Sequence, residues 1–186
     1  IEAGQINVVN QDIYYHSILA DAMLIVSPLA LHRNITIEYE PDLDENVFIH
    51  VDPIRLKEVI LNLLSNAIKY NRKGGMIKVN CLKVSDEIFR IEVIDNGDGL
   101  SEDKIQRLFQ PFERLGAENS EIEGTGIGLV ICKRIMEAMG GAIGIKSTVG
   151  KGSTFWIEVR LSKKLYEQQE DKFIDEQNNK FICEIP

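Results

Sequence analysis

The chain has 186 residues, 44% of them hydrophobic and 27% charged, which is enough for one soluble globular domain with an apolar core. Its net charge of −8 argues against general nucleic-acid binding, because there is no basic excess to displace counterions from phosphates. Three widely spaced cysteines (Cys81, Cys132 and Cys183) show neither disulfide nor zinc-site spacing, which favours a reducing, cytoplasmic compartment.

The chain starts with Ile rather than Met, and no signal-peptide pattern follows, so we expect a fragment of a longer protein. Its most apolar stretch, residues 22–31, is short for a membrane span and is interrupted by Ser27 and Pro28. We therefore expect no membrane contact from this fragment, even where a membrane anchors the parent protein.

Residues 1–11 are expected to end a connector, and Asp12 is expected to cap an amphipathic helix that Pro28 ends or kinks. Asp52 and Pro53 are of the types preferred at the N-cap and first position of a second helix. The further predicted elements are strands at 35–39, 47–49, 76–83 and 88–94, a short helix at 101–109, a helix at 125–139, and strands at 143–147 and 154–159.

This mixed order of helices and antiparallel strands predicts an α+β fold, a two-layer α/β sandwich in which helices cover one sheet. The globular domain is expected to span residues 12–162. The composition then shifts to Lys, Glu, Gln, Asp and Asn, so residues 163–186 are expected to form an acidic polar tail or linker.

The second helix carries a polar stripe on an otherwise apolar segment. Glu58, Asn62, Asn66 and Lys69 fall within an arc of roughly 80° on one helix face. Oxygen-donor side chains beside an ammonium group are typical of a site for a hard metal ion and phosphate. The alternative is an exposed ion pair between Arg55 and Glu58, with the two asparagines capping nearby backbone groups.

Two glycine-rich motifs follow the stripe. Residues 95–99 (Asp-Asn-Gly-Asp-Gly) come after an apolar strand, where the acid can accept a hydrogen bond from an exocyclic amine or simply form an Asx-turn. Residues 124–129 (Gly-Thr-Gly-Ile-Gly-Leu) precede a helix, where their backbone N–H groups can bind phosphate or the glycines can simply form a flexible hinge. Neither motif has the spacing of a P-loop or a dinucleotide fingerprint.

Between the glycine motifs lies a long loop with two aromatic side chains, Phe109 and Phe112. Long irregular loops in compact domains are often lids over a ligand. The alternative is that the aromatic rings dock on the core, which is more plausible for Phe109 than for Phe112.

This ordered set of motifs resembles the ATP-binding catalytic domain of sensor histidine kinases. That family shares the Bergerat fold with gyrase-type topoisomerases, heat-shock chaperones and mismatch-repair ATPases. The resemblance implies a mixed, mainly antiparallel sheet covered on one face by about three helices. The matching segments are residues 58–70 (N box), 95–99 (G1 box), 109–112 (F box), 124–129 (G2 box) and 150–155, the last glycine motif.

The resemblance also implies roles for individual residues. Asn66 and Asn62 would hold Mg²⁺, and Glu58 would be the catalytic base or polarising group. The lid would span about 100–124. The implied ATP-contacting residues are Asn62, Asn66, Lys69, Tyr70, Asp95, Gly97, Gly99, Leu100 and Thr154, with Phe112 and Arg114 in the lid and Gly124, Thr125, Gly126, Ile127, Gly128 and Leu129 at the helix start.

The histidine that such kinases phosphorylate is followed by an acid, and none of His16, His32 and His50 is. The resemblance therefore implies that the γ-phosphate of ATP goes to a histidine on a dimerisation domain of the same parent, and then to a response regulator receiver domain. We expect a monomeric fragment of a dimeric parent. The alternatives are an anti-sigma-type serine/threonine kinase and a nucleotide-binding module without transferase activity.

Overall fold

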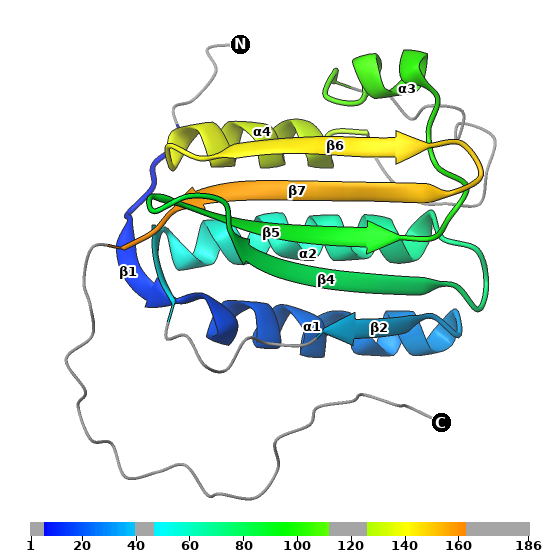
Figure 1. Cartoon of the computed structure of the whole chain (residues 1–186), viewed down its shortest axis with the longest axis horizontal. Coiled ribbons are helices and arrows are strands. Elements are labelled where there is room, and N and C mark those ends of the chain that lie inside the picture. Colours follow the sequence, from blue (N-terminus) through cyan, green and yellow to red (C-terminus); the bar gives the residue numbers. More distant parts are fainter. Residues whose placement is uncertain (1–5, 40–46, 112–125, 163–186) are drawn as a thin grey trace, which may run out of the picture.

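The structure is a computed structural model that describes residues 6–39, 47–111 and 126–162 (Figure 1). Its elements in chain order are β1 (Gln11–Tyr14), α1 (Tyr15–His32), β2 (Thr36–Tyr39), β3 (Phe48–Val51), α2 (Pro53–Lys69), β4 (Met76–Lys83), β5 (Ile88–Asp95), α3 (Glu102–Arg107), α4 (Gly128–Ala138), β6 (Ala142–Thr148) and β7 (Gly152–Arg160).

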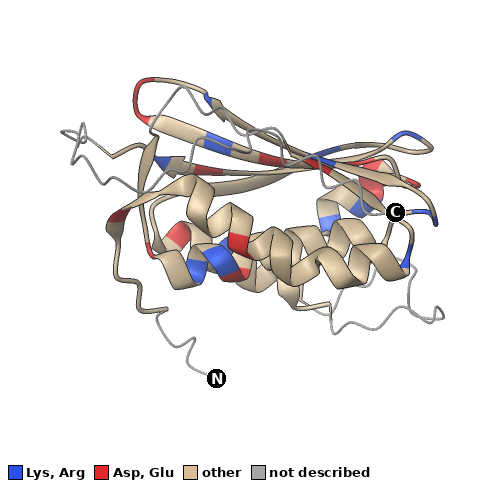
Figure 2. Ribbon diagram, turned by 90° about the horizontal axis from the view of Figure 1, so that it is seen from below, with Lys and Arg blue, Asp and Glu red and all other residues tan. Residues whose placement is uncertain are grey.

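A five-stranded sheet of order β2-β4-β5-β7-β6 forms one layer of the molecule. Its strands are antiparallel except for β2, which runs parallel to β4. Helices α1, α2 and α4 form the second layer on one face of this sheet (Figures 1 and 2). The predicted α+β sandwich, with a mixed and mainly antiparallel sheet, is therefore confirmed. A small second sheet pairs β1 with β3.

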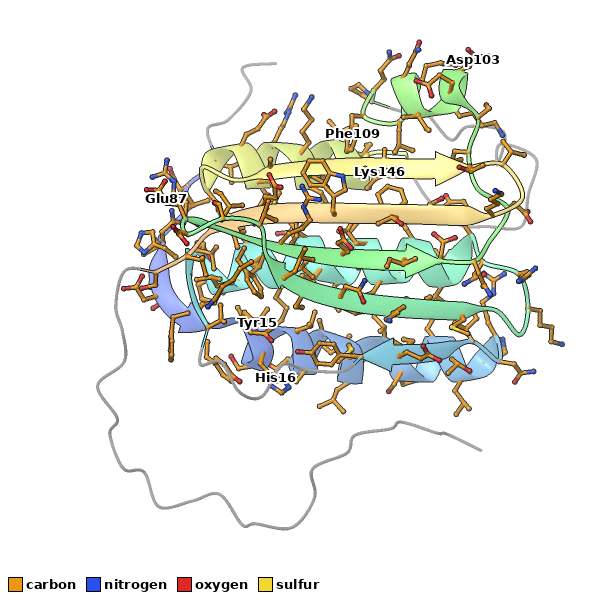
Figure 3. All side chains as sticks on the ribbon, in the orientation of Figure 1. Tyr15, His16, Glu87, Asp103, Phe109 and Lys146 are labelled. Atoms are coloured by element: carbon orange, nitrogen blue, oxygen red, sulfur yellow. The ribbon has the colours of Figure 1, made fainter. Side chains whose placement is uncertain are left out.

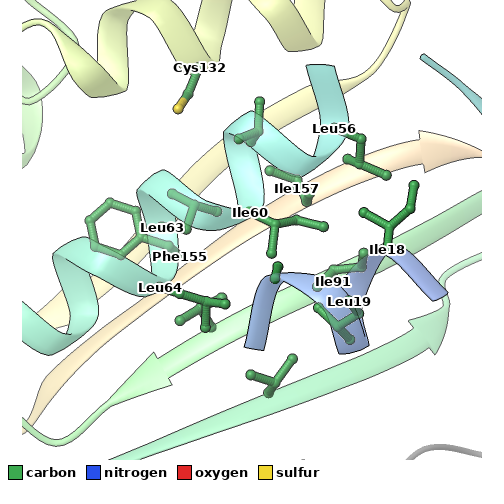
Figure 4. Close-up of a cluster of buried hydrophobic side chains, with 14 of the residues drawn as sticks. Ile18, Leu19, Leu56, Ile60, Leu63, Leu64, Ile91, Cys132, Phe155 and Ile157 are labelled. Atoms are coloured by element: carbon green, nitrogen blue, oxygen red, sulfur yellow. The ribbon is translucent and has the colours of Figure 1, made fainter. Parts of the chain in front are cut away.

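The core lies between the sheet and the three helices α1, α2 and α4 (Figure 4). Alternate residues of β5 and β7 face the helices, with Ile91 opposite Ile157 and Val93 opposite Phe155. They meet a face of α2 whose apolar side chains are at most 3% exposed. This face fixes how α2 is rotated, so Asn62, Asn66 and Lys69 lie half-buried at the edge of the core, whereas Glu58 is exposed.

The predicted start of the first helix is wrong. Asp12 does not cap it, because residues 11–14 pair with β3 as a strand and the helix begins at Tyr15. Asp12 instead faces His50 across the pair, with 2.7 Å between its Oδ1 and the histidine Nδ1. The competing partner is a distant segment, so a local helical pattern could not reveal it.

Helix α1 continues through Pro28 to His32. A proline removes the N–H that would bond the carbonyl four residues earlier, here that of Leu24. The hydroxyl of Ser27 donates to this Leu24 oxygen at 2.9 Å and satisfies it. The structure therefore does not end the helix at the proline.

The prediction that Asp52 caps α2 is confirmed. Its Oδ1 accepts hydrogen bonds from the N–H groups of Ile54 at 3.0 Å and Arg55 at 3.1 Å, and its Oδ2 accepts one from Val9 at 2.9 Å. Burial raises the pKa of this carboxyl, but the three amide bonds outweigh burial and hold it below its usual value. One side chain thus joins the entering chain to α2.

Replacing Asp52 with Ala is expected to lower the free energy of unfolding by about 2 kcal/mol, because a helix cap and the partner of a further backbone donor are lost. A depressed folded-state pKa stabilises the protein above the ordinary carboxyl pKa, and this stabilisation is lost on acidification. The deficit of the variant should therefore shrink at low pH. Denaturant melts at two pH values measure it, with the exposed Asp86→Ala as a control. An equal loss in both variants would contradict the role.

Candidate functional site

The polar stripe of α2 contains a pair of linked carboxamides. Asn62 and Asn66 are both half-buried, and the Nδ2 group of Asn66 donates to the Oδ1 of Asn62 at 3.0 Å. Lys69 is half-buried one turn further on, and Tyr70 ends the helix with 46% of its surface exposed. Glu58 is exposed at the other end, and the Nη1 of Arg55 lies 2.9 Å from its Oε2, as the ion-pair alternative expected.

The N-terminus of α4 lies against this pair. A Cβ added to Gly128, the first residue of α4, would lie only 2.4 Å from the Nδ2 of Asn62. Gly126 has a φ of +70°, a conformation that side chains other than glycine rarely adopt. Ile127 and Leu129 are half-buried beside it. The first N–H groups and the positive dipole end of α4 therefore face the same region as the two carboxamides.

Asp95 lies at the end of β5 on the helix-covered face of the sheet, in the same alternation as Val93. Its Oδ1 accepts from the N–H groups of Gly97 at 2.9 Å and Ser153 at 3.3 Å. Within the described ranges no hydrogen bond reaches its Oδ2. Burial raises the pKa of this carboxyl, and the two amide bonds partly offset the rise. Among the described residues, one oxygen is thus held by the protein and the other is left for a ligand.

The turn after Asp95 is enclosed by two other parts of the chain. A Cβ on Gly97 would lie 2.9 Å from the carbonyl oxygen of Tyr70, and one on Gly99, whose φ is +67°, only 2.1 Å from that of Thr148. The N–H of Leu100 donates to the Oγ of Ser147 at 2.8 Å. The end of α2 and the β6–β7 hairpin therefore fix the position of this turn.

Thr154 does not join the other site residues. It pairs with Ile94 and Lys146, and the strand alternation places it on the sheet face opposite to the helices. Ser153 is the β7 residue opposite Asp95. The sequence does signal that Ser153 rather than Thr154 faces inward, since apolar residues alternate from Phe155 onward and put odd-numbered positions inward.

Four expected site residues, Phe112, Arg114, Gly124 and Thr125, lie outside the described residues. The predicted lid is therefore described only from Leu100 to residue 111, and its closing role stays a prediction. Phe109, labelled in Figure 3, is half-buried beside α4, where the Nζ of Lys133 lies 5.7 Å from the centre of its ring. This favours the core-docking alternative for Phe109.

The site fits Mg²⁺ in the company of phosphate rather than Mg²⁺ alone. The described residues contain no group of three or more His, Cys, Asp or Glu that could hold a metal ion. Among the same residues, the Oδ1 of Asn66 accepts no hydrogen bond, which leaves it available as a ligand. Mg²⁺ commonly takes one or two protein oxygens and completes its octahedron with phosphate and water.

Residues 51–163 match the family model of histidine kinase-, DNA gyrase B-, and HSP90-like ATPases. The chain belongs to this family. The sensor protein GacS of Pseudomonas syringae pv. syringae is 38% identical to this ATPase domain over 176 residues, which cover 91% of the chain and 19% of GacS. The adaptive-response sensory kinase SasA of Prochlorococcus marinus (strain MIT 9303) is 35% identical over 150 residues, which cover 80% of the chain and 40% of SasA.

Solved structures show the same relationship. Full-length ShkA in complex with AMPPNP superposes with a TM-score of 0.72 at 27% identity, covering 86% of this chain and 33% of that chain. The catalytic domain of the histidine kinase ThkA has a TM-score of 0.71 at 25% identity, and the match covers 82% of this chain and 95% of the ThkA domain. The domain therefore has the Bergerat fold of histidine kinase catalytic domains, as the motifs predicted. It spans about a fifth of the length of the GacS relatives.

No helix of the described residues is long and apolar enough to cross a membrane.

Proposed function

We propose that this domain is the ATP-binding catalytic domain of a two-component sensor histidine kinase. It would transfer the γ-phosphate of ATP to a histidine on a dimerisation domain of its parent protein. One observation carries the proposal: the Asn62–Asn66 pair faces the N-terminus of α4, and Asp95 lies on the sheet face that these helices cover. The relatives named as sensor kinases favour this function over an anti-sigma-type serine/threonine kinase or a binding module.

Asp95 would recognise the base. Its Oδ2 can accept from the exocyclic amine of adenine, and the enclosed turn at Gly97, Gly99 and Leu100 would shape the pocket around the ring. Tyr70 lies at the end of α2 beside this turn, since a Cβ added to Gly97 would lie 2.9 Å from its carbonyl oxygen. The AMPPNP complex of ShkA supports an adenine nucleotide as the ligand of the fold.

The phosphates would lie between α2 and α4. Backbone N–H groups at Gly126, Ile127 and Gly128 would contact phosphate oxygens, with Lys69 as a cation. Asn62 and Asn66 would hold Mg²⁺, which supplies neutralisation of the phosphate charge when bound. Gly124, Thr125 and Leu129, and Phe112 and Arg114 from the lid, complete the proposed set. Catalysis would consist mainly of positioning and electrostatic stabilisation.

The downstream partner is proposed to be the receiver domain of a response regulator. ThkA, a structural neighbour at 22% identity and a TM-score of 0.69, was solved in complex with the response regulator protein TrrA. At that identity the likeness shows the fold alone, so the partner rests on the sensor-kinase relatives. We also propose a cytoplasmic location and a monomeric isolated domain within a dimeric parent.

The transfer is tested by mixing the chain with a separately produced dimerisation domain of the parent and ATP labelled on the γ-phosphate. We expect label on histidine, which is stable to alkali and lost in acid. Asn66→Ala should lower the labelling, because it removes the proposed Mg²⁺ ligand.

Asn80→Ala is the matched control, since Asn80 lies on the outward face of β4. Its labelling should equal that of the wild type. Absence of label with the wild-type chain would contradict the proposed transfer. Acid-stable label on serine or threonine would favour the anti-sigma-type alternative instead.

A further inference from the structure

Three polar side chains form one row across three neighbouring strands at the base end of the proposed site. Asp95 on β5 is opposite Ser153 on β7, and Ser153 is opposite Ser147 on β6 (Figure 1 shows these strands side by side). All three lie on the helix-covered face by strand alternation. Ser153 is only 8% exposed. The row is therefore part of the wall behind the proposed adenine position.

The hydroxyl of Ser147 has three neighbours. Its Oγ accepts from the N–H of Leu100 at 2.8 Å, donates to the carbonyl oxygen of Gly152 at 3.0 Å, and lies 2.9 Å from the Oγ of Ser153. A hydroxyl has one proton and two lone pairs. A carbonyl oxygen can only accept, so both contacts are hydrogen bonds only when the Ser147 proton goes to Gly152 and Ser153 donates to Ser147.

This arrangement fixes the polarity of Ser153. Its single proton is directed at Ser147, so only lone pairs remain for a ligand. The backbone N–H of Ser153 is also occupied, because it donates to the Oδ1 of Asp95 at 3.3 Å. The two neighbouring side chains therefore present acceptors: the Oδ2 of Asp95 and the Oγ of Ser153. Such a wall fits a base edge that carries an amine and disfavours one that carries a carbonyl oxygen.

We propose that Ser147 is a positioning residue that sets base specificity by holding Ser153 as an acceptor and fixing Leu100 at the pocket. The inference rests on the proposed adenine-nucleotide function and deepens it. Without the Ser147 hydroxyl, Ser153 is released to turn its proton toward the ligand. A carbonyl oxygen at the position of the adenine amine then finds a donor.

The test is an equilibrium titration of the whole 186-residue chain with Mg·ATP and with Mg·ITP, in which a carbonyl oxygen replaces the adenine amine. The wild type should prefer ATP. In Ser147→Ala we expect ATP affinity to fall about fivefold while ITP affinity is unchanged or higher, so the ATP-to-ITP preference narrows by about fivefold or more. Ser147→Thr keeps the hydroxyl and should restore the wild-type preference.

The matched control is Ser85→Ala. The Oγ of Ser85 also accepts a backbone N–H, that of Glu87 at 3.3 Å, but in the β4–β5 turn at the other end of the sheet. This variant should bind both nucleotides like the wild type. Ser153→Ala supplies a second route, because it removes the acceptor itself and should also narrow the preference.

Equal weakening of ATP and ITP in Ser147→Ala would indicate a merely structural role and overturn the inference. An unchanged preference in Ser153→Ala, or a Ser147→Thr variant that behaves like Ser147→Ala, would overturn it too. A wild-type chain that binds neither nucleotide would instead contradict the proposed function itself. The two failures are therefore distinguishable.

Discussion

Asp95→Asn is expected to remove most of the ATP affinity while the fold is retained. The Asn Oδ1 can still accept from the N–H groups of Gly97 and Ser153, so the turn keeps its hydrogen bonds. The other oxygen becomes an amide donor that opposes the adenine amine. Two donors, the side-chain amide and the adenine amine, would then face each other in an enclosed site without an acceptor. We expect this to weaken ATP binding about 10- to 100-fold, which calorimetric titration measures.

The same variant is expected to be at least as stable as the wild type at neutral pH. Burial raises the pKa of Asp95, so the folded state binds this proton more tightly than the unfolded state. This tighter proton binding stabilises the folded state fully below the ordinary carboxyl pKa of 3.8, and the stabilisation is lost as the pH rises through the folded-state pKa. Asn never ionises, so the advantage of Asp95→Asn in thermal melts should disappear on acidification.

Asp98→Asn is the matched control for this prediction. Asp98 is exposed in the same turn, and the bond of its carbonyl oxygen with the N–H of Gly150, 2.7 Å long, does not involve the side chain. Its ATP affinity should stay within about twofold of the wild type, as for an exposed charge. Wild-type ATP affinity in Asp95→Asn would contradict the base-binding role. Unfolding of that variant would contradict the claim that the turn survives.

Most of the fold could be predicted because each element carries its own local signal. Asp52 and Pro53 begin α2, and alternation marks β4, β5 and β7. The prediction for the segment at Asp12 failed because a distant partner decides its structure, since β3 pairs with it as a strand. Helix α1 does not end at Pro28, because the neighbouring Ser27 satisfies the Leu24 carbonyl. Neither effect follows from helical periodicity.

The site residues likewise divide into those that a local pattern predicts and those that depend on a distant partner. The stripe with Asn62 and Asn66 follows from the angle per residue in a helix, and Asp95 from its place at a strand end. Ser147 and Ser153 acquire their positions from strand register, which a single strand does not specify. The arrangement of acceptors at the base end of the site thus depends on the pairing of three strands. The phosphate end of the site could instead be predicted from two motifs, the polar stripe of α2 and the glycine motif before α4.

Glu58→Gln is expected to separate phosphoryl transfer from ATP binding. Glu58 lies one helical turn before Asn62 and is exposed, so it stands at the open end of the proposed phosphate site. Loss of a general base typically costs a factor of about 100 to 10,000 in rate. We expect transfer to a supplied dimerisation domain to slow about 100-fold or more, with ATP affinity within about twofold of the wild type.

Two further variants decide what Glu58 does. Its ion pair with Arg55 joins side chains that are 45% and 41% exposed, so the pair adds little stability. If Glu58 acts only as the partner of Arg55, then Arg55→Gln should slow transfer equally. If Glu58 is the base, Arg55→Gln should transfer at nearly the wild-type rate. Glu137→Gln, exposed at the far end of α4, controls for loss of a carboxylate. Rapid transfer by Glu58→Gln would remove this residue from the mechanism and leave catalysis to positioning alone.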